Sequence, residues 1–137
     1  MIYRTQDSGI VRQATSQVDF ELEGFHLREW LADDENVALT NLRGDVSLFE
    51  RQWRNPSIVT GHYFFFSRGR EALDVAKEML EEIWKEEYKV KTILGLTPVT
   101  HRGALWLNKR LGFKTIDTID AITGPCRLVQ LSKETQE

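Results

Sequence analysis

Several types of side chain in this sequence of 137 residues could act as an acid, a base or a nucleophile. They include three histidines, His26, His62 and His101, and one cysteine, Cys126. A histidine can serve as a general base near neutral pH because its ordinary pKa is about 6.5. The spacing of the histidines is not that of zinc ligands, so we expect no metal site. No base accompanies Cys126, and we do not expect it to act as a nucleophile.

His62 is the candidate general base. It lies near the end of a strand-like run, Ile58 to Phe66. In a cleft beside this strand, His62 could accept a proton from a bound substrate, directly or through a water molecule. The alternative is a buried histidine that hydrogen-bonds to a neighbouring strand. Tyr63 points to the opposite face, so a register shifted by one residue would give the role to Tyr63.

A candidate anion site follows the same run. Residues 67–70, Ser-Arg-Gly-Arg, directly precede the most regular helical pattern in the sequence. A helix N-terminus attracts phosphate because its first N–H groups are free and carry a partial positive charge. Gly69 allows the backbone to approach a ligand closely, and Arg68 and Arg70 could add charged hydrogen bonds to a pyrophosphate. In the alternative interpretation, Ser67 is only the helix cap and both arginines are solvated.

A strand, a helix and a second strand must position these candidates. The run Ile58 to Phe66 ends in residues that are apolar on both faces, so we predict a central strand. Apolar residues then recur at helical spacing from Gly69 to Glu87, and Val90 to Leu96 reads as the next strand. Two strands joined through a helix should form a right-handed parallel crossover. Pro98 cannot donate a ladder hydrogen bond, which suits a strand that is leaving its neighbour.

The rest of the chain predicts an α/β fold. We expect a mixed, mostly antiparallel sheet that has a central, splayed pair of parallel strands and helices on both faces. Trp30, Trp84 and Trp106 are expected to be substantially buried. The remaining predicted elements are strands over residues 2–5, 37–42, 46–53, 116–122 and 128–131 and helices over residues 11–17, 25–31 and 104–111.

Composition indicates an ordinary globular protein. Apolar residues make up 41% and charged residues 28% of the sequence, and the net charge is -3. We expect one domain over residues 1–137, with a polar tail from residue 132. The mild negative charge gives no strong nucleic-acid signal. We see no signal peptide and no apolar run long enough to cross a membrane, so we expect a cytoplasmic protein without a membrane partner.

Residues 104–113, Ala-Leu-Trp-Leu-Asn-Lys-Arg-Leu-Gly-Phe, resemble the GNAT family of acyl-CoA N-acyltransferases. Ala104, Leu107, Arg110 and the pair Gly112-Phe113 fall on the family pattern, and the order of the predicted elements resembles the family along nearly the whole chain. Within the family, the sequence looks most similar to divergent proteins encoded by phages. The features of that narrower resemblance are His62, the phenylalanines at 64–66, Gly69 and Gly112-Phe113.

The resemblance implies a GNAT fold that binds acetyl-CoA as cosubstrate and acetylates an amine acceptor that the sequence does not name. It implies catalytic roles for His62, as the base that takes a proton from the amine, and for Asn108, which stands at the position of the usual general acid. A backbone N–H of the central strand near residues 64–66 would stabilise the oxyanion. The residues expected to contact the acyl-CoA are Phe64, Phe65, Phe66, Arg68, Gly69, Arg70, Glu71, Ala72 and His101.

Four positions depart from the family pattern. In the phosphate loop, Phe66 replaces a basic residue and Glu71 replaces a small one. His101 stands where an Asn usually precedes the helix. Asn108 replaces the Tyr that acts as general acid in many members, and an amide cannot protonate a leaving thiolate effectively. A water molecule or His101 could take over that step.

Two hypotheses for the function follow. The first is an acetyl-CoA-dependent N-acetyltransferase, in which an amine attacks the thioester directly. Such an enzyme could be encoded by a phage. The second is a non-catalytic GNAT-fold protein, a structural or accessory component of a phage, that has lost acetyl transfer. Under the phage hypothesis we expect the protein in the bacterial host cytoplasm or in the phage particle. The sequence is compatible with a homo-oligomer or with assembly into a virion.

Overall fold

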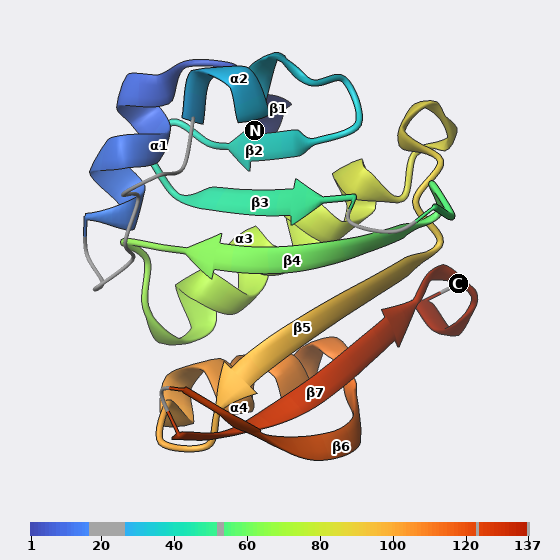
Figure 1. The fold of residues 1–137 in the computed structure, drawn as a ribbon. Helices are drawn as coiled ribbons and strands as arrows, with labels where there is room; N and C mark the ends of the chain where they lie inside the picture. The colour runs from blue at the N-terminus through green and yellow to red at the C-terminus, as the bar shows by residue number, and fades with distance from the viewer. Residues whose placement is uncertain (17–26, 52–53, 123, 137) are drawn as a thin grey trace.

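The structure is a computed structural model that describes residues 1–16, 27–51, 54–122 and 124–136. One sheet carries helices on both of its faces (Figure 1). The predicted ends at Gln17, Phe25 and Trp53 lie outside the described residues. In chain order the elements are β1 (Tyr3–Arg4), α1 (Ser8–Thr15), α2 (Leu27–Ala32), β2 (Val37–Thr40), β3 (Val46–Glu50), β4 (Ile58–Phe64), α3 (Gly69–Ile83), η1 (Glu86–Tyr88), β5 (Thr92–Pro98), α4 (Arg102–Leu111), β6 (Lys114–Ala121), β7 (Gly124–Ser132) and η2 (Lys133–Gln136).

The sheet has seven strands in the order β1-β2-β3-β4-β5-β7-β6. Every neighbouring pair is antiparallel except β4 and β5, which are parallel. The predicted mixed sheet with a central parallel pair is therefore confirmed. Pairing between β4 and β5 extends only from Ile58↔Thr92 to Thr60↔Leu94, and beyond it the two strands diverge (Figure 1).

Helix α3 forms the crossover between the parallel strands. Its apolar residues recur on one face and pack on the sheet, as their spacing predicted. The helix ends at Ile83 rather than at Glu87, because Lys85 is extended and the chain turns through η1 towards β5. Trp84 caps the helix and is buried, as expected. The buried residues of α3 are Ala72, Val75, Ala76, Met79, Leu80 and Ile83.

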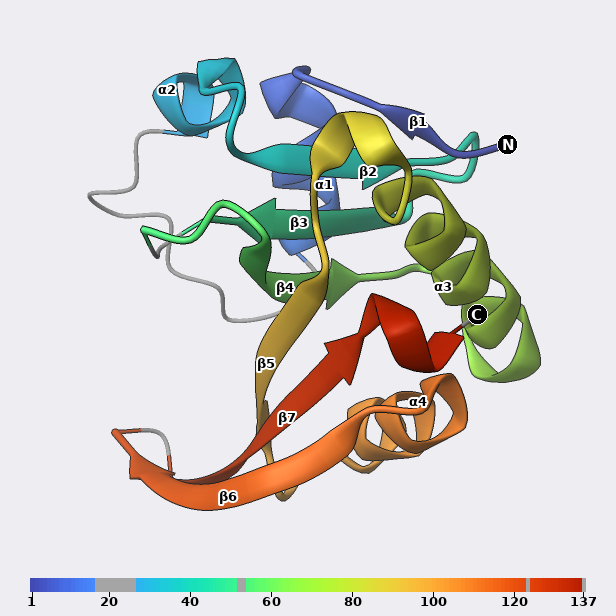
Figure 2. The same ribbon diagram turned by 90° about the vertical axis from the view of Figure 1, so that its right-hand side faces the viewer.

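The two faces of the sheet are covered by different helices. Helices α3 and α4 pack on one face, where Phe49, Val59 and Leu107 belong to the larger core cluster (Figure 2). Helices α1 and α2 cover the other face of β2, β3 and β4, where Leu48 and Phe64 belong to a second cluster. Side chains of a strand alternate between faces, so neighbouring residues of β4 serve different layers.

Several boundaries differ from the prediction. Leu42 lies in the β2–β3 connection and is 84% exposed instead of continuing the strand. Strand β7 begins at Gly124 rather than at Leu128, because its ladder with β5 and β6 continues through the polar Arg127. The expected polar tail from Ser132 is also structured: Ser132 ends β7, and the N–H of Lys133 donates to the carbonyl of Lys91 at 2.8 Å.

One of the three tryptophans predicted to be substantially buried departs from that expectation. Trp30 is partly buried and packs against the second core cluster. For Trp106 the expectation is wrong, since this residue is 40% exposed on α4 and lines a cavity. The guanidinium of Arg110 lies over the Trp106 ring, 5.4 Å from its centroid. A tryptophan at helical spacing therefore marks here the wall of an opening and not the core.

Candidate functional site

The divergence of β4 and β5 exposes backbone groups in the middle of the sheet. The carbonyl of Ser57 accepts the N–H of Thr92, and backbone groups alternate in direction along a strand. Strand β4 pairs with β3 without a bulge from Thr60 to Phe64. Alternate residues from Ser57 onward therefore turn their N–H and C=O groups towards β5. Tyr63 is one of them, and it lies beyond the last β4–β5 pair.

The opposite edge of the opening is formed by β5. Because the N–H of Thr92 faces β4, alternation places Leu96 and Pro98 on the same edge. Proline has no N–H, so Pro98 leaves no unpaired donor in the gap. The residue still pairs with Cys126 of β7 on its other side. This geometry agrees with the prediction that Pro98 lies where β5 leaves its neighbour β4.

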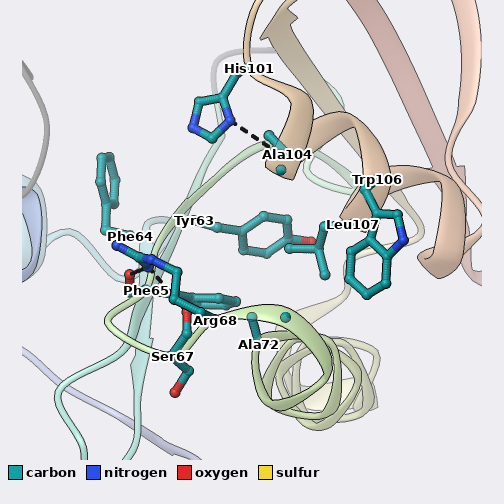
Figure 3. A pocket seen from close by; sticks show the side chains of 12 residues that line it. Tyr63, Phe64, Phe65, Ser67, Arg68, Ala72, His101, Ala104, Trp106 and Leu107 are labelled. Carbon is teal, nitrogen blue, oxygen red and sulfur yellow. Dashed lines mark hydrogen bonds between the residues drawn. The ribbon is translucent and has the colours of Figure 1, made fainter.

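Two cavities occupy the opening and share four lining residues, Tyr63, Phe64, His101 and Ala104. The first has a volume of about 580 Å³ and lies between the end of β4, the start of α3 and the face of α4 (Figure 3). The second, of about 310 Å³, lies between β4 and β5. Together they connect the N-terminus of α3 with the central part of β4.

A buried carboxylate shapes the loop between β4 and α3. Asp45, which directly precedes β3, has no exposed surface, and its Oδ1 accepts the N–H groups of Phe66 at 2.6 Å and Ser67 at 3.0 Å. Its Oδ2 accepts the hydroxyl of Ser67 at 2.7 Å and the side-chain amide of Asn41 at 3.0 Å. Burial by itself raises the pKa of Asp45, but the hydrogen bonds from Ser67, Asn41 and Phe66 outweigh it and hold the pKa below its ordinary value.

The N-terminus of α3 opens into the first cavity. The N-cap is Arg68, which makes no side-chain capping bond, so the interpretation of Ser67 as the cap is wrong. Gly69 has φ +58, and a Cβ built on it would meet nothing within 4 Å. The first N–H groups of the helix therefore adjoin open space. The Arg68 guanidinium donates to the carbonyls of Phe65 and Ser67 at the edge of the cavity (Figure 3).

The residues predicted to contact an acyl-CoA divide into two groups. Those that line a cavity are Phe64, Phe65, Arg68, Gly69, Ala72 and His101. The other three, Phe66, Arg70 and Glu71, line neither of the two cavities. The N–H of Phe66 is bound by Asp45, and its side chain is 42% exposed. Glu71 forms an ion pair with Arg43 on the surface, and Arg70 is exposed.

His62 lines the second cavity on the face of β4 that α1 and α2 cover. It is paired with Leu48 across the sheet, and its ring is stacked 6.4 Å from that of Phe64. Burial lowers the pKa of His62, and the nearby charge of Glu50 offsets part of that effect. The imidazole is therefore neutral at pH 7, which is the state that a general base requires.

Tyr63 points to the opposite face, as expected from the strand period. Its ring lines both cavities and lies 5.3 Å from the ring of Phe65. The Tyr63 hydroxyl is buried and has no hydrogen-bond partner within the described part of the chain. Burial raises the pKa of Tyr63, so the hydroxyl keeps its proton.

Asn108 and His101 reach the opening from α4. Asn108 is buried in the wall of the second cavity, and its Nδ2 donates to the hydroxyl of Thr97 on β5 at 2.9 Å. His101 is the N-cap of α4, where its Nδ1 accepts the N–H of Ala104 at 3.1 Å (Figure 3). In a neutral imidazole this bond assigns the proton to Nε2. His101 thus serves as the cap and lines both cavities.

Sequence reasoning missed two contacts near His62. Glu50 at the end of β3 pairs with Thr60, and its Oε2 accepts the indole N–H of Trp30 at 2.6 Å. Side chains alternate along a strand, so Glu50 shares a face with Leu48, and this spacing could have indicated a partly buried carboxylate. Nothing in the sequence pointed to Trp30 on α2 as its hydrogen-bond partner. Among the described residues there is no group of three or more His, Cys, Asp or Glu that could hold a metal ion.

Within the described residues, no helix is both long and apolar enough to span a membrane. No family model matches the sequence, and no curated protein matches it significantly.

Several acetyltransferases of known structure have the same fold. A GNAT-family acetyltransferase from Streptococcus pneumoniae is similar with a TM-score of 0.69 and 13% identity, over 96% of this chain and 98% of that one. A spermidine N-acetyltransferase chimera from Vibrio cholerae and hSSAT is similar with a TM-score of 0.74 and 9% identity, over 98% of each chain. The aminoglycoside acetyltransferase AAC(6′)-Ib in complex with coenzyme A is similar with a TM-score of 0.64 and 12% identity, over 98% of this chain and 95% of that one. This chain therefore has the GNAT fold.

Proposed function

We propose that this chain is an acetyl-CoA-dependent N-acetyltransferase with an amine acceptor. The observation that carries the proposal is the opening between β4 and β5, which joins the free N-terminus of α3 to a neutral, partly buried His62. Solved structures of the same fold include acetyltransferases crystallised with coenzyme A, which supports this choice of cosubstrate.

The residues around the first cavity fit an acyl-CoA. The N–H groups at the start of α3 and the guanidinium of Arg68 are suitable donors for a pyrophosphate, and Gly69 leaves room for it. The backbone of Tyr63 can pair with the amides of the pantetheine chain, as a further strand would. The Tyr63 hydroxyl, buried without a partner among the described residues, offers one more hydrogen bond. Neither Phe66 nor Glu71 is required in this arrangement.

Acetyl-CoA would supply an acetyl group activated as a thioester. In the proposed reaction the amine nitrogen attacks the thioester carbonyl, a C–N bond forms and the C–S bond breaks. His62 is neutral at pH 7 and accepts a proton from the amine. The backbone N–H of Tyr63 points into the gap, so we assign it the role of stabilising the oxyanion in place of the groups at 64–66.

Hydrogen-bond donors, rather than the usual tyrosine acid, stabilise the leaving sulfur. Asn108 has one amide N–H bound to Thr97 and a second that can donate to sulfur. His101 offers its Nε2 proton from the same wall. These groups stabilise a thiolate without protonating it fully, and water completes the step. Reaction with a poorer thiol leaving group should therefore be slow.

Calorimetry with acetyl-CoA tests the binding half of the proposal. Arg68→Ala should weaken binding at least about tenfold, because one charged hydrogen bond contributes about 1.5–3 kcal/mol. Arg70→Ala is the matched control, since Arg70 carries the same charge, is exposed and lines neither cavity. It should change the affinity less than about twofold. No measurable binding to the wild type at millimolar acetyl-CoA would reject the proposal.

Release of free thiol in the presence of a panel of amines tests the catalytic half. His62→Gln should keep the affinity for acetyl-CoA and lower turnover by about 100-fold, the lower bound for a general base. The competing hypothesis is a non-catalytic GNAT-fold protein, favoured by Asn108 at the position of the usual acid. It predicts no amine-dependent thiol release in the wild type, whether or not acetyl-CoA binds.

A further inference from the structure

We propose that Glu50, held in place by Trp30, is a positioning residue that stabilises His62 while it carries a proton and selects acceptors that are cationic at neutral pH. The inference rests on the proposed function and deepens it. It names the chemical class of the acceptor, an alkylammonium, and the group that recognises it.

The register of the sheet brings Glu50 and His62 to the same face. Glu50 pairs with Thr60 and His62 pairs with Leu48, so Glu50 and His62 are diagonal neighbours on adjacent strands. Such neighbours have Cα atoms about 7–8 Å apart, within reach of a long side chain. His62 also borders the gap that leads to β5. An amine that contacts His62 on this face would therefore have Glu50 as a diagonal neighbour.

The carboxylate is fixed by a bond from another layer. The indole N–H of Trp30 on α2 donates to Oε2 of Glu50 at 2.6 Å, and both groups are partly buried. A short bond from a neutral donor orients the carboxylate. This bond holds the Glu50 carboxylate on the face of the sheet where the imidazole lies.

Among the described residues of the elements packed on this face, Glu50 is the charged group that acts on His62. The charged residues of α1 and α2 are Arg12, Arg28 and Glu29, and all three are exposed. Strand β2 contributes none. Burial lowers the pKa of His62, and the charge of Glu50 raises it in part. Without Glu50, burial would leave the imidazole a weaker base.

The proton balance explains why a carboxylate is useful here. An alkylammonium, R–NH₃⁺, must lose two protons to become an amide. One leaves through His62 to solvent, and the other reaches the sulfur as the C–S bond breaks and the thiol forms. Glu50 attracts the incoming cation and then stabilises the imidazolium, as the carboxylate of a catalytic triad does for its histidine. An arylamine arrives neutral at pH 7 and needs less of this help.

Glu50→Gln tests the proposal, and Glu29→Gln is its control, because it removes the same charge from an exposed position on α2. Glu50→Gln should lower kcat/KM for an alkylamine about tenfold or more and for an arylamine less than about threefold. Acetyl-CoA affinity should stay within about twofold. Trp30→Phe should act in the same direction, and Glu50→Asp should restore part of the activity.

The titration of His62, followed by NMR of its ring, provides a readout that does not need turnover. Glu50→Gln should lower the pKa of His62 further, and Glu29→Gln should leave it unchanged. An unchanged His62 titration in Glu50→Gln, or an equal loss for both classes of amine, would overturn the role of Glu50. Absence of amine-dependent turnover in the wild type would instead reject the proposed function. Failure of the role of Glu50 and failure of the proposed function therefore give different results.

Discussion

Replacement of Asp45 should show how strongly the loop before α3 is held. The carboxylate accepts four hydrogen bonds from Asn41, Phe66 and Ser67, and three of these bonds are buried. Asp45→Ala leaves their donors without an acceptor. A hydrogen bond to a charged group contributes about 1.5–3 kcal/mol, and part of this is recovered because a buried charge disappears. We expect a net loss of about 3 kcal/mol of unfolding free energy.

Urea denaturation measures this loss, with Asp74→Ala on the exposed side of α3 as the control. The control should change the stability by less than about 0.5 kcal/mol. Asp45→Ala should also weaken acetyl-CoA binding, because the loop that leads to Gly69 loses its anchor. A loss of stability below about 1 kcal/mol would refute the reasoning, since it would mean that the four bonds contribute nothing net.

The stability should depend on pH through the same residue. The folded-state pKa of Asp45 lies below its ordinary value. A group of this kind stabilises the fold fully above its unfolded pKa of about 3.9, and the contribution is lost as the pH falls through the lower folded pKa. Asp45→Asn should lack this part of the acid dependence. Equal acid-unfolding profiles for the wild type and Asp45→Asn would contradict the assignment.

Four further substitutions test the core and the opening. Trp84→Ala should cost roughly 3–5 kcal/mol in urea denaturation, whereas Trp106→Ala at an exposed cavity wall should cost less than about 1 kcal/mol; similar losses would mean that the helix faces are misassigned. Tyr63→Phe should leave the stability equal or raise it by up to about 2 kcal/mol, and a clear decrease would show a bonded hydroxyl. Gly69→Val should weaken acetyl-CoA binding at least about tenfold by calorimetry, because φ +58 disfavours a branched side chain, and unchanged affinity would exclude this helix start as the phosphate site.

Patterns within one element were enough to predict much of the fold. The helical spacing of α3 identified its buried face, and the apolar end of β4 identified a central strand. The connection between β4 and β5 through a helix implied their parallel pairing. These predictions succeed because burial of an element is recorded in its own periodicity.

Contacts between distant elements were not predictable from the same patterns. Asp45 and Ser67 are 22 residues apart, and Trp30 and Glu50 are 20 residues apart. Each pair joins groups whose partners are known only when the strands and helices are placed in space. Trp106 shows the converse limit, because periodicity marks the inward face of a helix but cannot distinguish a core from a cavity.

The short pairing of β4 with β5 divides the sheet into two leaves. One leaf consists of β1 to β4 and the other of β5, β7 and β6, and three residue pairs join them. Beyond Thr60↔Leu94 no ladder bond connects the leaves, and the larger core cluster under α3 and α4 packs against both. Amides that face the gap, such as those of Tyr63 and Leu96, should exchange with solvent faster than amides inside either leaf. A molecule bound between β4 and β5 would form hydrogen bonds with the backbone of both strands and so slow the exchange of these amides in both leaves.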